Sequence, residues 1–505
     1  MTSGASIVLY RNETPLDLHL ARLTESLGIQ CSMIRLGDAD GLGQSLYNLQ
    51  SSLCVMVSAC SLAAVLQDKT ICSEVVATLF ERIRFFLVYG ITPDEREAYA
   101  VRYLTNGMVA SVVNFDLSSY SYQVSATERE ITQEFSGLTF GPINHEIDFG
   151  LVLPQYSAEF SNLVSINNLP IFGSLKKGSS CLFLLACSQI ADVEAYTDGS
   201  LSAHRYFSRI VPVVMFLRRV FQDRAWHNPR RYANFIIDDP LLRQSYGFLN
   251  YSRLLAEMDR CEFATTIAFI PWNYRRTHPS IARLMRERSD RFSICIHGCD
   301  HTEGEFASTD VGELNARTGL ATQRMRVHEG STGVPYSDVI VFPQGKFSTA
   351  SLSVLKRHNY LAAVNSTVVP EDLGKAHDLT VADLLAPAVS KYGSFPLFMR
   401  RYPGEIADVA LDLFLGKPAL LVEHHSYFKN GYDAIRAFIT QINSLSRDLQ
   451  WRNLSEALSN TYLQKTISPF LIECKILTRR QTIHNSGCVG REYILLKNED
   501  DSGAN

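Results

Sequence analysis

The second half of the chain repeats one pattern six times: a short apolar run, then a polar loop or a helical segment. The runs are NFIIDD, FATTIAFI, RFSICIH, DVIVFP, YLAAV and ALLVEHH, spread between Asn234 and His425. Strands that alternate with helices pair in parallel, because each helix carries the chain back to the same end of the sheet. The pattern therefore predicts a βα barrel or an open parallel sheet, with chemistry at the carboxyl ends of the strands.

The remainder of the 505 residues predicts additional domains, and the fold class is α/β throughout. Residues 1–190 alternate β-rich and helical stretches, which predicts an amino-terminal domain with a mostly parallel sheet that acts in scaffolding or recognition. Its end, PIFGSLKKGSSCLFLLAC, predicts a hairpin. Residues 191–230 are expected to form a connecting helix and linker, 231–462 the barrel, and 463–505 a small β appendage with a disordered tail.

Composition limits the partners and the compartment. With 48 basic and 52 acidic residues the net charge is −4, which does not favour nucleic acid or an anionic membrane as a partner. No apolar run approaches the roughly 20 residues of a membrane span, and the start of the chain has no signal-peptide pattern. Eleven cysteines, several of them inside apolar runs, favour reduced thiols over a disulfide framework. We therefore expect a cytoplasmic protein without a membrane span.

Four clusters of polar residues directly follow these apolar runs. In chain order they are Asp238-Asp239, His297 with His301, Pro343-Gln344-Gly345, and His424-His425. Two histidines and one carboxylate leave positions on a cation open for water and substrate, which is typical of hydrolytic metal sites. We expect Asp239, His297 and His301 to hold a divalent cation, with zinc the first choice for such a ligand set.

Other interpretations of the same residues stay open. Asp238 and Asp239 precede a proline and could form a solvated turn or a helix cap. A histidine at a strand end is often a core residue. A closed zinc site formed by the two histidines together with Cys295 and Cys299 would require a sharp bend at the intervening glycine, because alternate residues of an extended strand lie too far apart.

Two residues could carry the proton transfers. Asp238 adjoins an expected metal ligand and could accept a proton from water. His424 ends the last apolar run, and the near-neutral pKa of imidazole suits a general acid. The segment FIPWNYRR places Trp272, Tyr274 and Arg276 where a sugar could stack or an acidic group could be held.

Gln344 and His425 complete the set of residues that we expect to contact the substrate. Both stand at the ends of strand-like runs, where a barrel places its ligand. Each of the expected substrate residues could equally be a packed loop residue.

The clusters, in this order, resemble the motifs of the polysaccharide deacetylase superfamily, which comprises metal-dependent carbohydrate esterases built on a distorted βα barrel. The resemblance covers roughly residues 233–455. IIDDP is similar to the motif that implies Asp238 as base and Asp239 as ligand. HGCDH is similar to the histidine pair, which implies His297 and His301 as ligands, and LLVEH to the motif that implies His424 as acid. The resemblance implies a hydrolase that removes an N- or O-acyl group, foremost N-acetyl, from a carbohydrate.

The chain departs from the family's pattern at three points. Pro240 stands where the family usually has glycine, and VFPQGKF has no arginine before its proline. The supporting Asp-x-x-Asp-Trp segment is not recognisable between residues 380 and 392. No arginine therefore supports Asp238 from the family's usual position.

Two alternative functions follow from these departures. A glycoside hydrolase would pair Asp238 with a second carboxylate about 5 to 9.5 Å away, for which the candidates are Glu303, Glu305 and Glu423. A non-catalytic carbohydrate-binding protein would use the pocket only to hold its ligand.

Overall fold

The computed structural model describes residues 5–36, 52–67, 83–115, 120–143, 146–154, 159–485 and 490–499. The chain divides into two compact units. The first comprises Met1–Ala195, Leu201–Trp226 and Lys465–Ile467, and the second Tyr196–Ser200, His227–Gln464 and Ser468–Asn505. Among the helices of the described ranges, none is long and apolar enough to cross a membrane.

The first unit contains a nine-stranded sheet with the order β2-β1-β3-β4-β11-β10-β9-β6-β7. Its parallel strands are β1 (Ala5–Tyr10), β2 (Cys31–Arg35), β3 (Ser52–Ser58), β4 (Phe85–Tyr89) and β11 (Ser180–Leu185). Its antiparallel strands are β6 (Tyr120–Val124), β7 (Thr139–Ile143), β9 (Phe160–Ile166) and β10 (Leu169–Lys177), which also pairs with β11 in the predicted hairpin. The sheet is therefore mixed rather than mostly parallel, because short turns return the chain in the opposite direction.

Helices cover this sheet in two pairs. Helix α1 (Pro15–Ser26) packs against α7 (Ala203–Phe221), and α3 (Ala59–Gln67) packs against α5 (Glu95–Leu104). The strands β5 (Ser111–Asn114) and β8 (Phe149–Val152) form a separate antiparallel pair. Helix α7, expected in the connecting segment 191–230, instead lies within the first unit, where its apolar residues are buried.

The second unit is built around seven parallel strands in the order β19-β18-β17-β16-β15-β12-β20. They are β12 (Arg231–Asp238), β15 (Thr265–Phe269), β16 (Phe292–His297), β17 (Tyr336–Val341), β18 (Ala362–Asn365), β19 (Leu397–Met399) and β20 (Ala419–His424). An eighth strand, β21 (Leu449–Trp451), pairs with β12. Six of these strands coincide with the predicted apolar runs, whereas β19 and β21 span three residues each and give no comparable signal.

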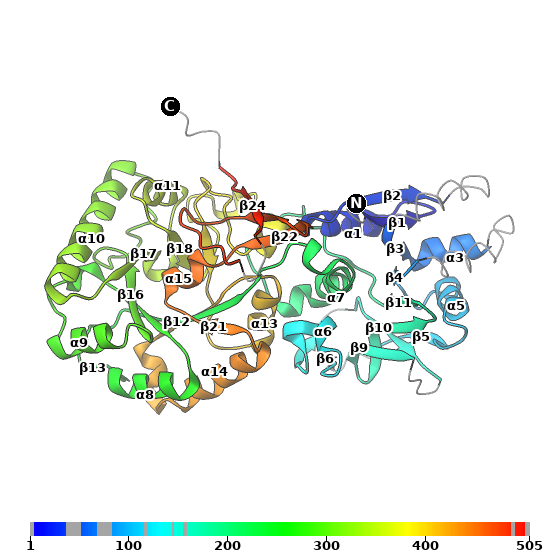
Figure 1. The fold of residues 1–505 in the computed structure, drawn as a ribbon, viewed down its shortest axis with the longest axis horizontal. Helices are drawn as coiled ribbons and strands as arrows, with labels where there is room; N and C mark the ends of the chain where they lie inside the picture. The colour runs from blue at the N-terminus through cyan, green and yellow to red at the C-terminus, as the bar shows by residue number, and fades with distance from the viewer. Residues whose placement is uncertain are drawn as a thin grey trace. The chain divides into compact units, whose positions relative to one another are not determined.

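Helices surround these strands (Figure 1). They are α8 (Tyr251–Cys261), α9 (Pro279–Glu287), α10 (Val311–Thr332), α11 (Thr349–Arg357), α13 (Ile406–Phe414) and α14 (Asp433–Leu445). Beyond β19, the Arg401 N–H donates to the carbonyl of Leu420, and the Val422 N–H donates to the carbonyl of Arg401, each at 2.8 Å. These bonds nearly close the sheet between β19 and β20, so the predicted distorted barrel is confirmed.

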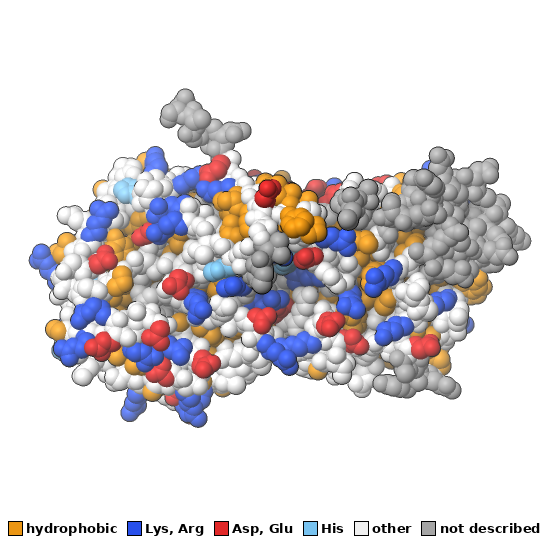
Figure 2. Space-filling model, in the orientation of Figure 1, with side chains coloured by type: hydrophobic (Ala, Val, Ile, Leu, Met, Phe, Trp, Pro, Cys, Tyr) orange, Lys and Arg blue, Asp and Glu red, His pale blue; other side chains and the backbone are white. Residues whose placement is uncertain are grey.

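The expected β appendage is a three-stranded sheet of β22 (Leu463–Ser468), β23 (Leu471–Lys475) and β24 (Glu492–Leu496). Most of it belongs to the second unit rather than standing apart. Hydrophobic side chains gather on its exposed side, among them Phe470 and Leu495 (Figure 2). Elsewhere on the face shown in Figure 2, basic and acidic side chains are interspersed.

His328 on α10 makes the stability of the barrel dependent on pH. The side chain is buried against Phe269, its Nε2 lies 2.8 Å from the Thr277 hydroxyl, and burial lowers its pKa to about 4. An unfolded histidine has a pKa of about 6.5. As the pH falls from 6.5 toward 4, the unfolded chain therefore binds a proton that the folded state does not, and the free energy of unfolding decreases.

Urea unfolding at pH 7 and pH 5 measures this decrease. His328→Leu should lose less stability between the two pH values than the wild type. The control His278→Asn alters an exposed histidine at the start of α9 and keeps a residue that can cap the helix, so it should show the full decrease. The same decrease in all three proteins would exclude His328 as its source.

Candidate metal centre

Strand alternation places four polar side chains at the mouth of the barrel. Four residues of the barrel core, Ile236, Cys295, Phe398 and Val422, lie on four different strands or strand ends. Successive side chains of a strand point to opposite faces, so the residue two positions later faces the same interior. Those residues are Asp238, His297, Arg400 and His424. All four occur where the strands end, and β12 and β20 pair with Asp238 directly opposite His424.

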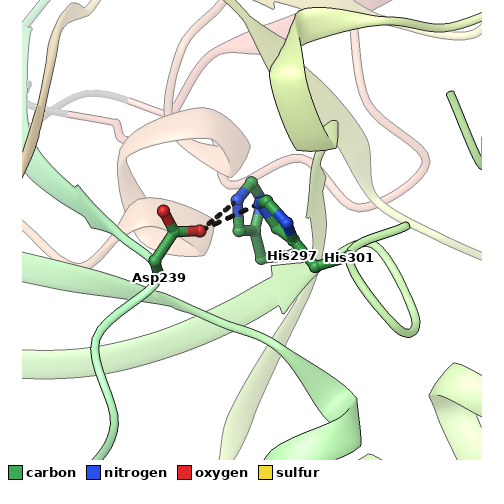
Figure 3. Close-up of side chains that lie close together, drawn as sticks. All are labelled: Asp239, His297 and His301. Carbon is green, nitrogen blue, oxygen red and sulfur yellow. Dashed lines mark ion pairs between the residues drawn. The ribbon is translucent and has the colours of Figure 1, made fainter. Parts of the chain in front are cut away.

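Asp239 and His301 come from the loops that follow β12 and β16, and both have the left-handed backbone conformation, with φ of 77° and 61°. This conformation is uncommon outside glycine and clusters at functional sites. It turns the Asp239 carboxylate toward the two imidazoles (Figure 3). One carboxylate oxygen, Oδ1, lies 3.1 Å from Nε2 of His297 and 3.1 Å from Nε2 of His301.

The ligand atoms of these three residues are close enough together to bind one cation. Their ligand atoms all lie within 4.8 Å of one another. Tetrahedral zinc with ligand bonds of about 2.0–2.1 Å separates its ligand atoms by roughly 3.3 Å, close to the two distances from Oδ1. The spacing also resembles that of an octahedral ion, so it does not select zinc over other divalent metals.

The protonation of these residues also suits a cation. The Nδ1 atom of buried His297 lies 3.0 Å from the carbonyl of Val341, which favours a proton on Nδ1 and would leave the Nε2 lone pair for a bound cation. Burial raises the pKa of Asp239, but when no cation is bound, hydrogen bonds and charge from the two imidazoles outweigh burial and hold that pKa far below its usual value. The buried Oδ1 atom still has no hydrogen bond of good geometry among the described residues. An ionised carboxylate oxygen and two imidazole nitrogens are donor atoms that divalent metals bind.

Asp238 is a buried carboxylate held by an arginine. Nη1 of Arg400 donates to Oδ1 at 2.8 Å and Nη2 donates to Oδ2 at 2.7 Å, and both residues are at most 4% exposed. Burial raises the pKa of Asp238, but the charges of Arg400 and His297 offset it, so the net pKa lies below the usual value. Asp238 is therefore ionised near neutral pH and fixed beside the three candidate ligand residues.

His424, the last residue of β20, also lies close to Asp239. Its Nε2 is 3.9 Å from Oδ2 of Asp239, and its side chain is 40% exposed. The ring of Tyr402, itself half exposed, stacks against the imidazole with centroids 6.4 Å apart. An imidazole that contacts both the ligand set and solvent can exchange protons with a bound molecule.

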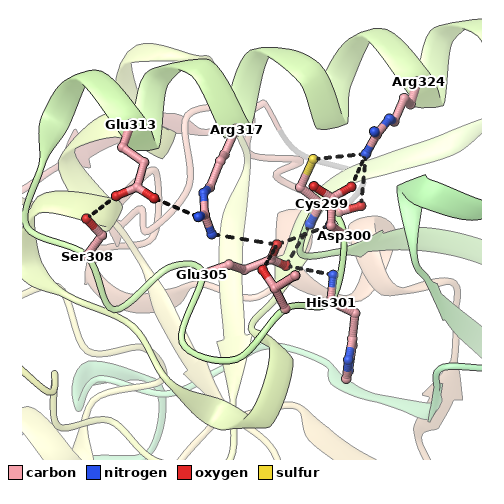
Figure 4. A network of polar contacts seen from close by, with 9 residues as sticks. Cys299, Asp300, His301, Glu305, Ser308, Glu313, Arg317 and Arg324 are labelled. Atoms are coloured by element: carbon pink, nitrogen blue, oxygen red, sulfur yellow. Dashed lines mark hydrogen bonds and ion pairs between the residues drawn. The ribbon is translucent and has the colours of Figure 1, made fainter.

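The loop that carries His301 is organised by one buried carboxylate, Glu305 (Figure 4). Its oxygens accept the backbone N–H groups of Cys299 at 2.8 Å, Asp300 at 3.1 Å and His301 at 3.3 Å. Gly298 opens the loop with φ of 63°, and a β-carbon there would lie 1.9 Å from Oε1 of Glu305. The loop therefore depends on Glu305 to hold His301 in place and on Gly298 to make room for Glu305.

Glu305→Gln should weaken metal binding about 10- to 100-fold, the range found for residues that support metal ligands. The amide has a single acceptor oxygen and would direct its own N–H bonds toward the backbone donors. Glu303→Gln is the matched control, because Glu303 is exposed and pairs only with Lys346 in the described chain. Competition with a chelating dye measures both affinities, and equal affinities would contradict this role for Glu305.

The expected substrate residues lie in different surroundings. Trp272, Tyr274 and Arg276 line one pocket with residues of α10, and no expected metal ligand lines it. Gln344 is exposed, with φ of 57°. His425 packs against the rings of Tyr246 and Phe248, with centroids 5.1 and 6.2 Å away.

The alternative assignments find less support. Cys299 takes no part in the ligand cluster, and its Sγ instead lies 3.3 Å from Nη1 of Arg324. Glu305 is occupied by backbone N–H groups, and Glu303 pairs with Lys346. Glu423 lies opposite Ile237 rather than Asp238, out of phase with the interior positions.

Sequence reasoning missed Arg400 and misjudged Glu305. Arg400 binds Asp238 from the end of β19. The resemblance had pointed to the segment VFPQGKF as the position of such an arginine. The available signal was an arginine directly after the apolar Leu397–Met399, a run too short to stand out as a strand. From the sequence, Glu305 is a candidate only for the second carboxylate of a glycoside hydrolase.

Comparison with known proteins supports the fold assignment. No family model matches the sequence, and no curated protein matches it. Among solved structures, the chain is similar to Agd3, described as a novel carbohydrate deacetylase, with a TM-score of 0.54 and 9% identity over 90% of this chain and 86% of that chain.

Two smaller structures also match, with lower scores. A family 4 carbohydrate esterase from Streptomyces lividans, in complex with acetate, has a TM-score of 0.27 and 14% identity over 44% of this chain and 92% of its own. A family 4 acetyl xylan esterase from Clostridium thermocellum, in complex with a cobalt ion, has a TM-score of 0.28 and 12% identity over 45% and 90%. The similarity to Agd3 confirms the expected resemblance in the fold.

Proposed function

We propose that this protein is a metal-dependent hydrolase that removes an acyl group, foremost N-acetyl, from a carbohydrate. The observation that carries the proposal is the convergence of Asp239, His297 and His301, with Asp238 fixed beside them by Arg400. The similarity to Agd3 supports the same conclusion through the fold.

Each residue has a role in this reaction. A divalent cation held by the three ligands would polarise both a water molecule and the acyl carbonyl. Asp238 accepts a proton from the attacking water, because it is ionised, buried and held in one orientation. His424 donates a proton to the departing amine or alcohol from the partly open side of the site. Zinc is our first choice of metal, and a carbohydrate is the expected substrate class.

Metal removal tests the proposal. The protein treated with a chelator should release no acetate from N- or O-acetylated oligosaccharides. Addition of Zn²⁺, Mn²⁺, Co²⁺ or Ni²⁺ should restore release. New reducing ends with no acetate would instead favour the glycoside hydrolase, and ligand binding with neither product under any metal would favour the binding protein.

A further inference from the structure

A second candidate site lies on the barrel next to the loop that carries His301. It is a pocket of about 530 Å³ between the segment after β15 and one face of α10. Its lining residues combine aromatic, aliphatic and cationic side chains: Trp272, Tyr274, Arg275, Arg276, Leu320, Gln323, Arg324 and Val327. Its residues on α10 are Leu320, Gln323, Arg324 and Val327, which follow the i, i+3, i+4, i+7 spacing of a single helix face. A volume of this size accommodates a small ligand such as a sugar residue.

The pocket has an excess of positive charge. Of its three arginines, Arg324 pairs with Asp300. Arg275 lies over the ring of Tyr274, and Arg276 donates to the side-chain oxygen of Asn273 at 3.3 Å. Within the described chain neither Arg275 nor Arg276 pairs with a carboxylate, and both are exposed. Two guanidinium groups are therefore available for an anion, which they can bind in a bidentate manner.

The pocket also offers an aromatic surface in a fixed position. The Trp272 backbone N–H donates to the carbonyl of Cys299 at 3.0 Å, and the guanidinium of Arg324 lies 5.0 Å from the centre of the indole ring. The side chain nevertheless remains 54% exposed. Exposed indole rings stack on the apolar faces of sugars, and Leu320 and Val327 extend the apolar surface beside it.

The pocket connects to the metal centre through one short segment. Arg324 contacts Asp300, and the next residue is the expected ligand His301. In Figure 4 the His301 side chain points away from Arg324, so the two sites lie on opposite sides of this loop. The pocket is thus a separate site, adjacent to the one proposed for acyl hydrolysis.

We propose that this pocket binds a negatively charged sugar residue, carrying a carboxylate or a sulfate ester, of the glycan on which the metal centre acts. The sugar ring stacks on Trp272, and Arg275 and Arg276 bind the anionic group. The claim that the bound glycan is also the substrate of the metal centre rests on the proposed function. The claim that the pocket binds an acidic sugar does not.

Isothermal titration of the full chain tests the binding with four probes: trigalacturonate, a sulfated trisaccharide, neutral chitotriose and inorganic sulfate. We expect at least one acidic sugar to bind at least tenfold more tightly than chitotriose and sulfate, and the preferred one identifies the anionic group. Arg275→Gln/Arg276→Gln should lose this preference. Trp272→Ala should weaken sugar binding but not sulfate binding. The matched control, Arg283→Gln, alters an exposed arginine on α9 outside the pocket and should bind as the wild type does.

Three results would overturn the proposal. They are equal affinity for acidic and neutral sugars, sulfate binding as tight as sugar binding, and unchanged affinity in the double arginine variant. The metal-ligand variant Asp239→Ala separates this proposal from the hydrolase. If the wild type and Asp239→Ala both bind acidic sugars but neither hydrolyses an acyl group, only the proposed function is contradicted. If the wild type hydrolyses acyl groups but shows no preference for acidic sugars, only the proposal for the pocket is contradicted.

Discussion

Asp238→Asn should lower the rate of acyl hydrolysis about 10²- to 10⁴-fold, the usual contribution of a general base. The amide is close in size to the carboxylate but cannot accept a proton from water. Its three neighbouring ligand residues are unchanged, so metal should still bind. Loss of activity together with retained metal is the combination that identifies a base rather than a ligand.

The control for this variant is its folding, because the amide leaves the charge of Arg400 without its partner. Circular dichroism and metal content should therefore be measured on the protein used for kinetics. The corresponding Glu423→Gln variant alters a carboxylate of the adjacent strand that faces away from the interior positions, and we expect it to retain most activity. Wild-type rates in Asp238→Asn would exclude Asp238 as the base.

Arg400→Met should lower the free energy of unfolding by roughly 3–5 kcal/mol, the cost of leaving a buried charge without its partner. Arg400 makes two hydrogen bonds to Asp238, and both side chains are almost completely buried. Methionine has a similar length and no charge, so the variant isolates the loss of the ion pair. Urea unfolding measures the change.

A second substitution distinguishes the ion pair from packing. In Asp238→Asn/Arg400→Met neither side chain of the pair carries a charge, so part of the lost stability should return. Arg283→Met, on the exposed face of α9, should stay within about 0.5 kcal/mol of the wild type. Equal losses in the single Arg400 variant and the double variant would show that packing, rather than charge, determines the stability.

The barrel could be predicted because six of its strands, each four to eight residues long, contain apolar runs that alternate with helices. Because side chains two positions apart face the same side of a strand, Asp238, His297 and His424 face the barrel interior, each two positions after a core residue. Short strands give no such pattern, and Arg400 was missed because it follows a strand of three residues. Its partner lies 162 positions earlier in the chain, a distance that local patterns do not bridge.

The other differences have similar causes. Parallel and antiparallel strands have the same side-chain alternation, so the mixed sheet of the first unit could not be separated from a parallel one by sequence pattern. Glu305 looked like a catalytic carboxylate because its role comes from backbone N–H groups, which carry no sequence signature. Trp272 was expected where a sugar could stack, but the pocket that it lines depends on α10, about fifty residues later in the chain.

Metal content tests the central claim most directly. Plasma mass spectrometry should be applied to the purified wild type, to Asp239→Ala, His297→Ala and His301→Ala, and to the exposed control Glu303→Gln. We predict close to one divalent metal ion per chain in the wild type and the control, and its loss in all three ligand variants. A folded wild type that contains no metal and takes up none on reconstitution would contradict the account, as would ligand variants that retain it.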